Sequence, residues 1–375
     1  MNAESCNGKG VLPSQALEKM IANGAIRARA PILPEQIQPS SIDLRLGTEA
    51  YRVRASFLAT GAATVTSKLE QYRLHTIDLT KSAVLEKGCV YIVPLQEELS
   101  LPADISGKAN PKSSTGRLDI FTRLITDEGR QFEIVPPGYK GRLYAEVVPR
   151  TFSVVVRQGE RLSQLRLFQG ESIPSDVLLR QLESEEALVY LPDETRGEPA
   201  IRNGLRLSVD LAGVDGSEII GYRAKKHAPL IDLARVQYYE PDDFWDPIRR
   251  NDSRTLILDP EDFYILASRE KVRIPAQYAA EMVPFDPTIG EFRIHYAGFF
   301  DPGFGYGGGE INGTRAVLEV RSHEVPFILE DGQVVASLVF ERLLERPKLL
   351  YGEGIGSSYQ RQGLKLSKHF RTFSK

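Results

Sequence analysis

The chain has 375 residues, of which 42% are hydrophobic and 26% are charged. This is the composition of a globular protein, and the length indicates two domains or one large domain. The formal net charge of −3 leaves no basic excess of the kind that general nucleic-acid binders show. Any phosphate ligand must therefore be held by a local cluster of residues.

The cysteine and histidine content excludes several classes of metal and disulfide protein. Two cysteines, Cys6 and Cys89, cannot form a disulfide framework or a four-sulfur zinc site. The five histidines are scattered and form no HExxH pattern. No apolar run approaches the roughly 18 residues that cross a bilayer, and the N-terminus has no hydrophobic signal core. We therefore expect a cytoplasmic protein that binds neither nucleic acid nor a membrane and that contains no zinc.

One short amphipathic helix is expected near the N-terminus, where Ser14 can cap the start, Leu17 and Met20 fall on one face, and Gly24 ends it. The segments that follow are short, rich in Val, Ile, Leu and aromatic residues, and separated by Pro and Gly turns, which is typical of strands. The expected strands are 89–95, 142–148, 151–156, 161–168, 255–259, 263–267, 315–320 and 334–344. Few stretches carry helical periodicity, so the sequence predicts an all-β sandwich or barrel with a few short helices.

An internal repeat of long period divides the chain. Two blocks, 85–105 and 141–165, reappear at a constant offset of 173 residues as 258–278 and 314–338. Within this register Glu146 corresponds to Glu319. A third block, SIDLRLG, returns as LSVDLAG. We infer a duplicated domain with a boundary near a charged, turn-rich stretch, giving domains 1–190 and 191–375.

The repeat unit resembles dCTP deaminase, a member of the dUTPase-like all-β superfamily. The similarity rests on KSSTGRLDIFTRLIT (112–126), GRLYAEVV followed by RQGERLSQLRLF, HYAGFFDPGF (295–304) and SSYQRQGLKLSKHF (357–370). It covers nearly the whole chain as two copies. The resemblance implies two tandem dUTPase-like β-barrel or jelly-roll domains, with the Ser/Arg block in the first and the pocket aspartate, catalytic glutamate and closing tail in the second.

The two copies have lost complementary motifs. The first keeps the Ser/Arg block but has IVPPGY (134–139) where the family has its pocket aspartate, and Thr126 where the family usually has alanine. The second keeps the pocket strand and Glu319, but its counterpart of the serine block, 283–292, has neither Ser-Ser nor arginine. In the family, active sites lie between subunits, each of which supplies one side. The pattern therefore predicts one composite site between the two halves and a dead mirror-image site.

Glu319 is the predicted general base. Strand alternation places Val317 and Glu319 on one face of 315–320. From the strand alone, an exposed glutamate beside Arg315 and Arg321 is the more ordinary interpretation. The resemblance implies instead that Glu319 takes a proton from water and relays it to the cytosine ring.

The other catalytic roles also follow from the resemblance. Ser113 and a backbone carbonyl near Ala297 would hold the water, and Arg117 would support charge at the reacting atoms. Glu146 is the possible base of the second copy, and we expect its loss to have little effect on activity.

The remaining site residues are predicted to bind the nucleotide. The resemblance implies that Asp301 accepts the sugar 3′-hydroxyl, that Lys112 and Ser114 bind phosphate, and that Tyr359 and Gln362 reach the triphosphate from the tail. Without the resemblance, each of these residues has a more ordinary interpretation. Asp301 could simply form a turn with Pro302 and Gly303, KSSTGR could be an ordinary polar turn, and the tail could be a disordered terminus. We expect loss of the tail to abolish activity without lowering the melting temperature.

GFGYGG (303–308) fits the GxGxxG pattern but lacks a following helix, so a flexible hairpin is favoured over a dinucleotide site.

The expected activity is deamination of dCTP to dUTP and ammonia, with Mg²⁺ accompanying the triphosphate. The alternatives are a dUTPase or a bifunctional enzyme, although DPGF lacks the tyrosine usual in a dUTPase, and a non-catalytic nucleotide-binding regulator. The family also suggests a homo-oligomer and inhibition by dTTP.

Overall fold

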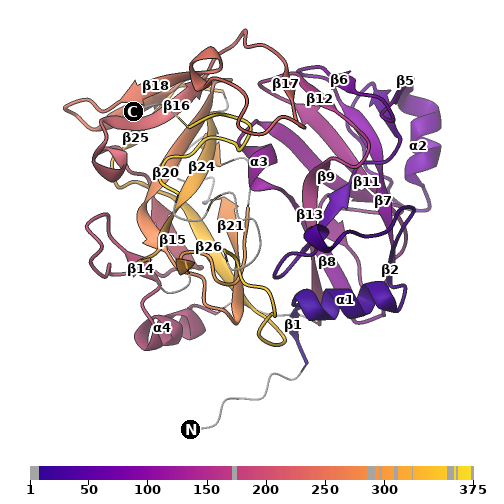
Figure 1. The fold of residues 1–375 in the computed structure, drawn as a ribbon, viewed down its shortest axis with the longest axis horizontal. Coiled ribbons are helices and arrows are strands. Elements are labelled where there is room, and N and C mark those ends of the chain that lie inside the picture. Colours follow the sequence, from indigo (N-terminus) through magenta and orange to yellow (C-terminus); the bar gives the residue numbers. More distant parts are fainter. Residues whose placement is uncertain are drawn as a thin grey trace.

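The computed structural model describes residues 8–170, 175–284, 292–294, 298–307, 311–322, 324–352, 359 and 362–372, with only the backbone of 284 and 292–294. Sheets dominate both halves of the chain, which lie side by side (Figure 1). No helix in these ranges is long and apolar enough to cross a membrane. The prediction of an all-β protein built from two tandem domains is confirmed.

Two sheets face each other in the first half. One has the order β1-β13-β8-β10 with β3 on β13, and the other has the order β5-β4-β7-β11-β9 with β2 on β7. A smaller sheet contains β6 and β12. The bounds are β1 Gly10–Val11, β2 Ile26–Ala28, β3 Ile42–Arg45, β4 Glu49–Val53, β5 Arg73–Asp78, β6 Ala83–Leu85, β7 Tyr91–Ser100, β8 Ile105–Pro111, β9 Ile120–Thr126, β10 Ile134–Val135, β11 Lys140–Pro149, β12 Val154–Val156 and β13 Arg161–Gln169.

The second half repeats this topology. Its sheets have the orders β18-β16-β20-β24-β22, with β14 on β20, and β15-β26-β21-β23, while β19 pairs with β25. The bounds are β14 Val189–Tyr190, β15 Leu205–Ser208, β16 Ile219–Ala224, β17 Ile231–Asp232, β18 Trp245–Arg249, β19 Thr255–Leu258, β20 Phe263–Val272, β21 Tyr278–Pro284, β22 Phe292–Ile294, β23 Phe299–Phe300, β24 Thr314–Ser322, β25 Phe327–Glu330 and β26 Val334–Arg342. Strand by strand, β7, β8, β11 and β13 correspond to β20, β21, β24 and β26, which confirms the duplication.

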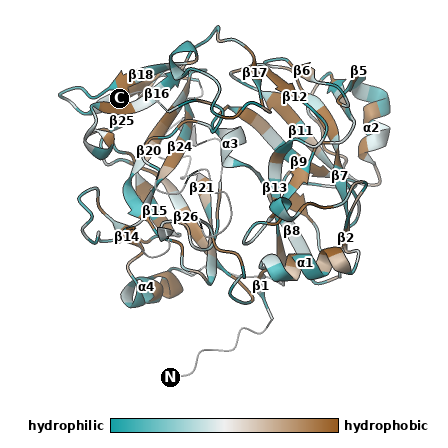
Figure 2. Ribbon diagram, viewed as in Figure 1, coloured by the Kyte–Doolittle hydropathy of each residue, from teal (hydrophilic) through white to brown (hydrophobic). Residues whose placement is uncertain are grey.

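Each half has its own hydrophobic core. Hydrophobic residues concentrate along the strands of both halves (Figure 2), and their side chains form these cores. Strands such as β3 and β24 are buried along their whole length. The chain enters the second core before the predicted boundary at 190/191, because Leu179, Leu182 and Val189 already pack there.

The second half also reaches over the first. β17 pairs in parallel with β12, so that Ile231 lies opposite Val154. Nearby, Phe152 of the first half packs edge-on against Phe244 and Trp245, and Phe370 packs against the same two rings. This aromatic cluster anchors both a loop and the C-terminal segment of the second half on the first.

Four helices accompany the sheets in the described ranges: α1 Ser14–Ala22, α2 Val65–Tyr72, α3 Ser113–Gly116 and α4 Asp176–Glu185. α1 is where it was predicted, but Ser14 is its first residue and not its cap. The extended N-cap residue is Pro13, and it makes no side-chain capping bond. α2 and α4 were not predicted.

The GxGxxG segment forms turns from Gly303 to Tyr306, with Phe304 buried, and its last residue lies outside the described ranges. Gly307 is the start of a 3-10 turn at the edge of the described residues, and β24 begins at Thr314. The interpretation of this segment as a hairpin without a dinucleotide site stays a prediction.

Candidate active site

A cavity of about 330 Å³ lies between the two halves and is lined by residues of both. It gathers eight of the predicted site residues: Lys112, Ser113, Ser114, Arg117, Asp301, Glu319, Tyr359 and Gln362. Ala297 lies outside the described residues, so its predicted role stays a prediction. The serine block of the first half forms one side of the cavity, and the second half forms the other side, as the complementary loss of motifs predicted.

The serine block forms a tight turn at the end of β8. Pro111 ends that strand, Lys112 is extended, and Ser113 begins α3. The backbone N–H groups of Thr115 and Gly116 donate back to the Lys112 carbonyl, at 2.8 and 3.0 Å. This turn presents Lys112 and the two serines to the cavity and directs Arg117 toward the second half.

Glu319 occupies the middle of β24 and points into the cavity. Leu318 lies in the second core on the other face, and Val317 lines the cavity beside Glu319, as the alternation predicted. The exposed-face alternative is wrong, because Glu319 is only 5% exposed and Arg315 and Arg321 are buried as well. Burial raises the pKa of Glu319 to about 7, partly opposed by the positive charge of Arg117.

Arg117 is held by the C-terminal segment. It donates to the Gln362 Oε1 and to the Lys365 carbonyl, both at 2.8 Å, and its guanidinium lies 3.9 Å from the centre of the Tyr359 ring. Gln362 in turn donates to the backbone carbonyl of Arg315, at 3.0 Å. The tail therefore positions the arginine that faces Glu319.

The tail is also part of the first core, which the sequence did not predict. Leu366 and Phe370 are buried there, and Ser367 donates to the Ser114 carbonyl at 2.8 Å. A segment with these contacts contributes to stability, so the expectation that its removal leaves the melting temperature unchanged is not supported.

Asp301 follows β23 directly and closes another side of the cavity. Its Oδ1 accepts a 2.6 Å hydrogen bond from Ser40 of the first half. The turn interpretation holds as well, because the Phe304 N–H donates to the Asp301 carbonyl and Gly303 has a φ of 91°. Burial raises the pKa of Asp301, while Arg166 and Ser40 oppose that rise.

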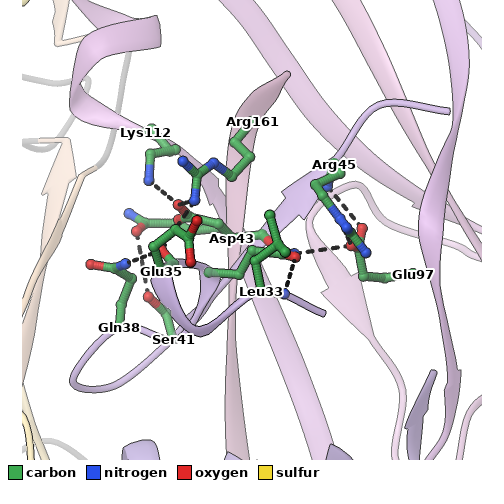
Figure 3. Close-up of polar contacts among 11 residues, drawn as sticks. Leu33, Glu35, Gln38, Ser41, Asp43, Arg45, Glu97, Lys112 and Arg161 are labelled. Carbon is green, nitrogen blue, oxygen red and sulfur yellow. Dashed lines mark hydrogen bonds and ion pairs between the residues drawn. The ribbon is translucent and has the colours of Figure 1, made fainter. Parts of the chain in front are cut away.

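The end of the cavity near Lys112 is strongly polar (Figure 3). Lys112 donates to the Asp43 Oδ2, and the Arg161 Nη1 lies 3.7 Å from the same oxygen. Glu35 and Lys368 line this end too, and like charges on Lys112 and Arg161 add to burial in lowering the pKa of Lys368. Three cations facing one buried aspartate make this the natural place for an anion.

Several of these cavity residues were not predicted. They are Glu35, Gln38, Asp43, Arg161, Tyr351 and Lys368. Asp43 carried a usable signal, since SIDLRLG is one of the repeated blocks. Arg161 begins an ordinary strand and Lys368 lies in a polar tail, so neither had a distinguishing pattern.

Glu146 lies apart from this cavity. It is fully buried, and its Oε1 accepts from Arg123 at 2.6 Å within the same half. An apolar cluster that includes Leu69 of α2 and Tyr144 packs over this region. The Glu146 carboxylate is thus paired with a cation of its own domain and covered by apolar side chains.

The described residues include no group of three or more His, Cys, Asp or Glu side chains placed to hold a metal ion. A Mg²⁺ ion bound mainly through triphosphate oxygens needs fewer protein ligands. Asp43 fits such a companion ion, because its buried Oδ1 has no hydrogen-bond partner among the described residues and it lines the anion end of the cavity.

The duplicated sheets and the shared polar cavity place the chain among the dUTPase-like β proteins. Family models for the N-terminal and C-terminal domains of 2′-deoxycytidine 5′-triphosphate deaminase match residues 8–171 and 175–370. The chain therefore belongs to the dCTP deaminase family.

Solved and curated relatives agree with this assignment. The crystal structure of 2′-deoxycytidine 5′-triphosphate deaminase from Agrobacterium tumefaciens is 50% identical, with a TM-score of 0.85 over 91% of this chain and 100% of that one. A dCTP deaminase of Natronomonas pharaonis is 28% identical over 36% of this chain and 68% of its own length. A dUMP-forming dCTP deaminase of Thermobifida fusca is 28% identical over 43% and 79%.

Proposed function

We propose that the chain hydrolyses dCTP to dUTP and ammonia at the cavity that Glu319 and the serine block line between its halves. The observation that carries this proposal is the meeting of Glu319 with Arg117: the Oε1 of one lies 3.8 Å from the Nε of the other, and both are almost fully buried. A carboxylate with a pKa of about 7 can accept a proton from water near neutral pH and return it later in the reaction.

The proposed step balances with water as the only co-reactant. The water oxygen bonds to C4 of the cytosine ring, and Glu319 takes a water proton and delivers it to ring N3. A second proton transfer allows the C4 amino group to leave as ammonia, and the C4–O bond becomes the uracil carbonyl. Ser113 would orient the water, with the carbonyl near Ala297, and Arg117 would stabilise developing negative charge. This makes the chain a hydrolase of a cyclic amidine C–N bond.

The substrate would lie along the length of the cavity. Asp301 would accept the 3′-hydroxyl, and Lys112, Ser114, Tyr359 and Gln362 would bind the triphosphate. Mg²⁺ would neutralise phosphate charge there, and Asp43 and Glu35, which line this end of the cavity, would be the residues that accept hydrogen bonds from its waters. A deoxynucleoside triphosphate is an intracellular metabolite, so this activity would place the protein in the cytoplasm.

The proposal includes only one active site per chain. Glu146 is paired with Arg123 and covered by the cluster that contains α2, so it would serve as a structural residue. In the first half, Pro136 follows β10 at the position where Asp301 follows β23 in the second half. A mirror-image pocket would therefore lack its sugar-binding carboxylate.

The test is incubation of the full chain with dCTP and Mg²⁺, with ammonia, dUTP and pyrophosphate each quantified. Equal amounts of ammonia and dUTP without pyrophosphate are expected. Pyrophosphate with dUMP would show the bifunctional reaction, and tight dCTP binding without ammonia would show a regulator. Glu319→Gln serves as the matched inactive control.

A further inference from the structure

Arg166 is a fully buried arginine that the proposed chemistry does not use. It projects from β13 of the first half, has 0% exposure, and lies among residues of the second half. Its Nη1 donates to the Glu341 Oε2 at 2.9 Å and to the Ala280 carbonyl at 3.2 Å. Burying a charge this completely is costly unless nearly every donor finds a partner. The sequence gives no hint of it, since RLSQLRLF looks like an ordinary strand.

The other side of the guanidinium faces the sugar-binding wall of the cavity. Its Cζ lies 3.9 Å from the centre of the Phe299 ring, and Nη2 donates to the Phe300 carbonyl at 3.4 Å. These two residues form β23, and Asp301 follows them directly. Arg166 therefore holds the strand that carries the pocket aspartate.

Arg166 also reaches Asp301 through Ser40. Nη2 donates to the Ser40 Oγ at 3.2 Å, and the same Oγ donates to the Asp301 Oδ1 at 2.6 Å. The direct distance from Nη2 to Oδ1 is 4.0 Å. The relay fixes Oδ1, and no hydrogen bond to the Asp301 Oδ2 is seen within the described part of the chain. Oδ2 is therefore the oxygen that would accept from a ligand.

We propose that Arg166 is a positioning residue that sets the 3′-hydroxyl specificity of the site, by orienting Asp301 through Ser40 and through the backbone of β23. The inference rests on the proposed function, because it takes Asp301 as the acceptor of the sugar hydroxyl. It adds a specificity determinant that comes from the domain opposite to the one that carries Asp301. The two halves would thus have to be docked before the sugar could be recognised.

The experiment compares the binding of dUTP with that of its 2′,3′-dideoxy analogue by calorimetry in the presence of Mg²⁺, which requires no turnover. A hydrogen bond to a charged acceptor predicts a preference of about 10- to 100-fold for dUTP in the wild-type chain. Asp301→Asn sets the baseline for a lost preference. Arg166→Lys and Ser40→Ala should each lower the preference at least fivefold, mainly because the chain binds dUTP more weakly.

Arg321→Lys is the matched control. Arg321 is also a buried arginine at the domain junction, where it pairs with Asp119 of the first half, but it does not contact Asp301. It should lower the melting temperature and keep the preference. Should Arg166→Lys fail to fold, Ser40→Ala removes the relay with a smaller change.

A folded Arg166→Lys or Ser40→Ala with wild-type preference would overturn the positioning role. A wild-type chain without any preference would overturn both that role and the assignment of Asp301. Ammonia release from dCTP, measured separately on the wild type, reports the proposed function independently of either result.

Discussion

The Arg117 Nε lies 3.8 Å from the Glu319 Oε1, although the two side chains belong to different copies of the repeat. Their pseudo-equivalents do not repeat the contact, because Glu146 pairs with Arg123 of its own domain. Duplication normally gives two copies of every site. In this chain the cross-domain pair of Arg117 and Glu319 lines a cavity together with the serine block and the pocket aspartate.

The two glutamates should respond differently to the same substitution. Glu319→Gln should lower kcat by about 10²- to 10⁴-fold, because a neutral amide cannot accept the proton from water. Glu146→Gln should keep kcat within a few-fold and should lower stability by about 1–3 kcal/mol, since it weakens a buried hydrogen bond to Arg123. Steady-state kinetics and thermal unfolding of both variants measure this contrast. Comparable losses of activity in the two variants would refute the single-site proposal.

The pH dependence of activity should carry the signature of Glu319. The base works only when ionised, so kcat/KM, which reports the pKa of the free enzyme, should rise with pH and level off above about 7. A pH–rate profile of the wild type measures this limb, with the residual activity of Glu319→Gln as the control. A plateau that already extends down to pH 5 would contradict the assignment.

Stability should change with pH in the opposite direction. The folded pKa of about 7 lies above the usual 4.5, so the folded state binds more protons between these values and loses stability as pH rises through this window. The loss is about 1.4 kcal/mol per pKa unit at most. Denaturant unfolding at pH 5 and pH 8 should therefore show Glu319→Gln gaining stability relative to the wild type at the higher pH. An unchanged difference between the two pH values would argue against the raised pKa.

The sequence predicted most of what local pattern and duplication can encode. Alternation along 315–320 placed Val317 and Glu319 on one face, and the family resemblance made Glu319 the catalytic base. The complementary losses in the two copies predicted that the cavity would lie between them. Two short helices were missed although their signals were present. Thr64 and Ser67 form a capping box at the start of α2, and Ser175 caps α4.

Other features could not be predicted because they arise only when distant segments converge. Arg161 and Lys368 become part of an anion site through their nearness to Lys112. Arg166 becomes a partner of Asp301 only through the docking of the two halves. The tail looked like a polar terminus, because Leu366 and Phe370 stand in a segment rich in Gly, Lys and Ser and their burial depends on the other domain.

Truncation of the tail should affect both activity and stability. Ending the chain after Ser357 removes the contacts of Gln362 and Tyr359 with Arg117. It also deletes Leu366 and Phe370 and so uncovers the part of the first core on which they pack. We expect loss of measurable deamination and a lower melting temperature. Phe370→Ala alone should cost about 3–5 kcal/mol in stability, whereas Gln362→Ala should reduce activity with a smaller thermal effect. A truncated chain with an unchanged melting temperature would show that the packing of the tail on the first core contributes nothing.

Binding of the triphosphate should depend on Lys112. The Nζ donates to Asp43 at the polar end of the cavity, where a phosphate oxygen can become its partner. Lys112→Met should raise KM for dCTP by about 10- to 100-fold, the value of a hydrogen bond between charged groups, with a smaller change in kcat. Added salt should raise the wild-type KM more than that of the variant, because one charge has been removed.

Lys108→Met provides the matched control for this charge. Lys108 lies on β8, four residues before Lys112, and pairs with Glu281 at 2.6 Å across the domain junction, outside the cavity. Its loss should lower stability slightly and leave KM and the salt dependence of KM near those of the wild type. Similar KM increases in both variants would mean that the two lysine charges act through docking of the domains, and that Lys112 does not contact the phosphates.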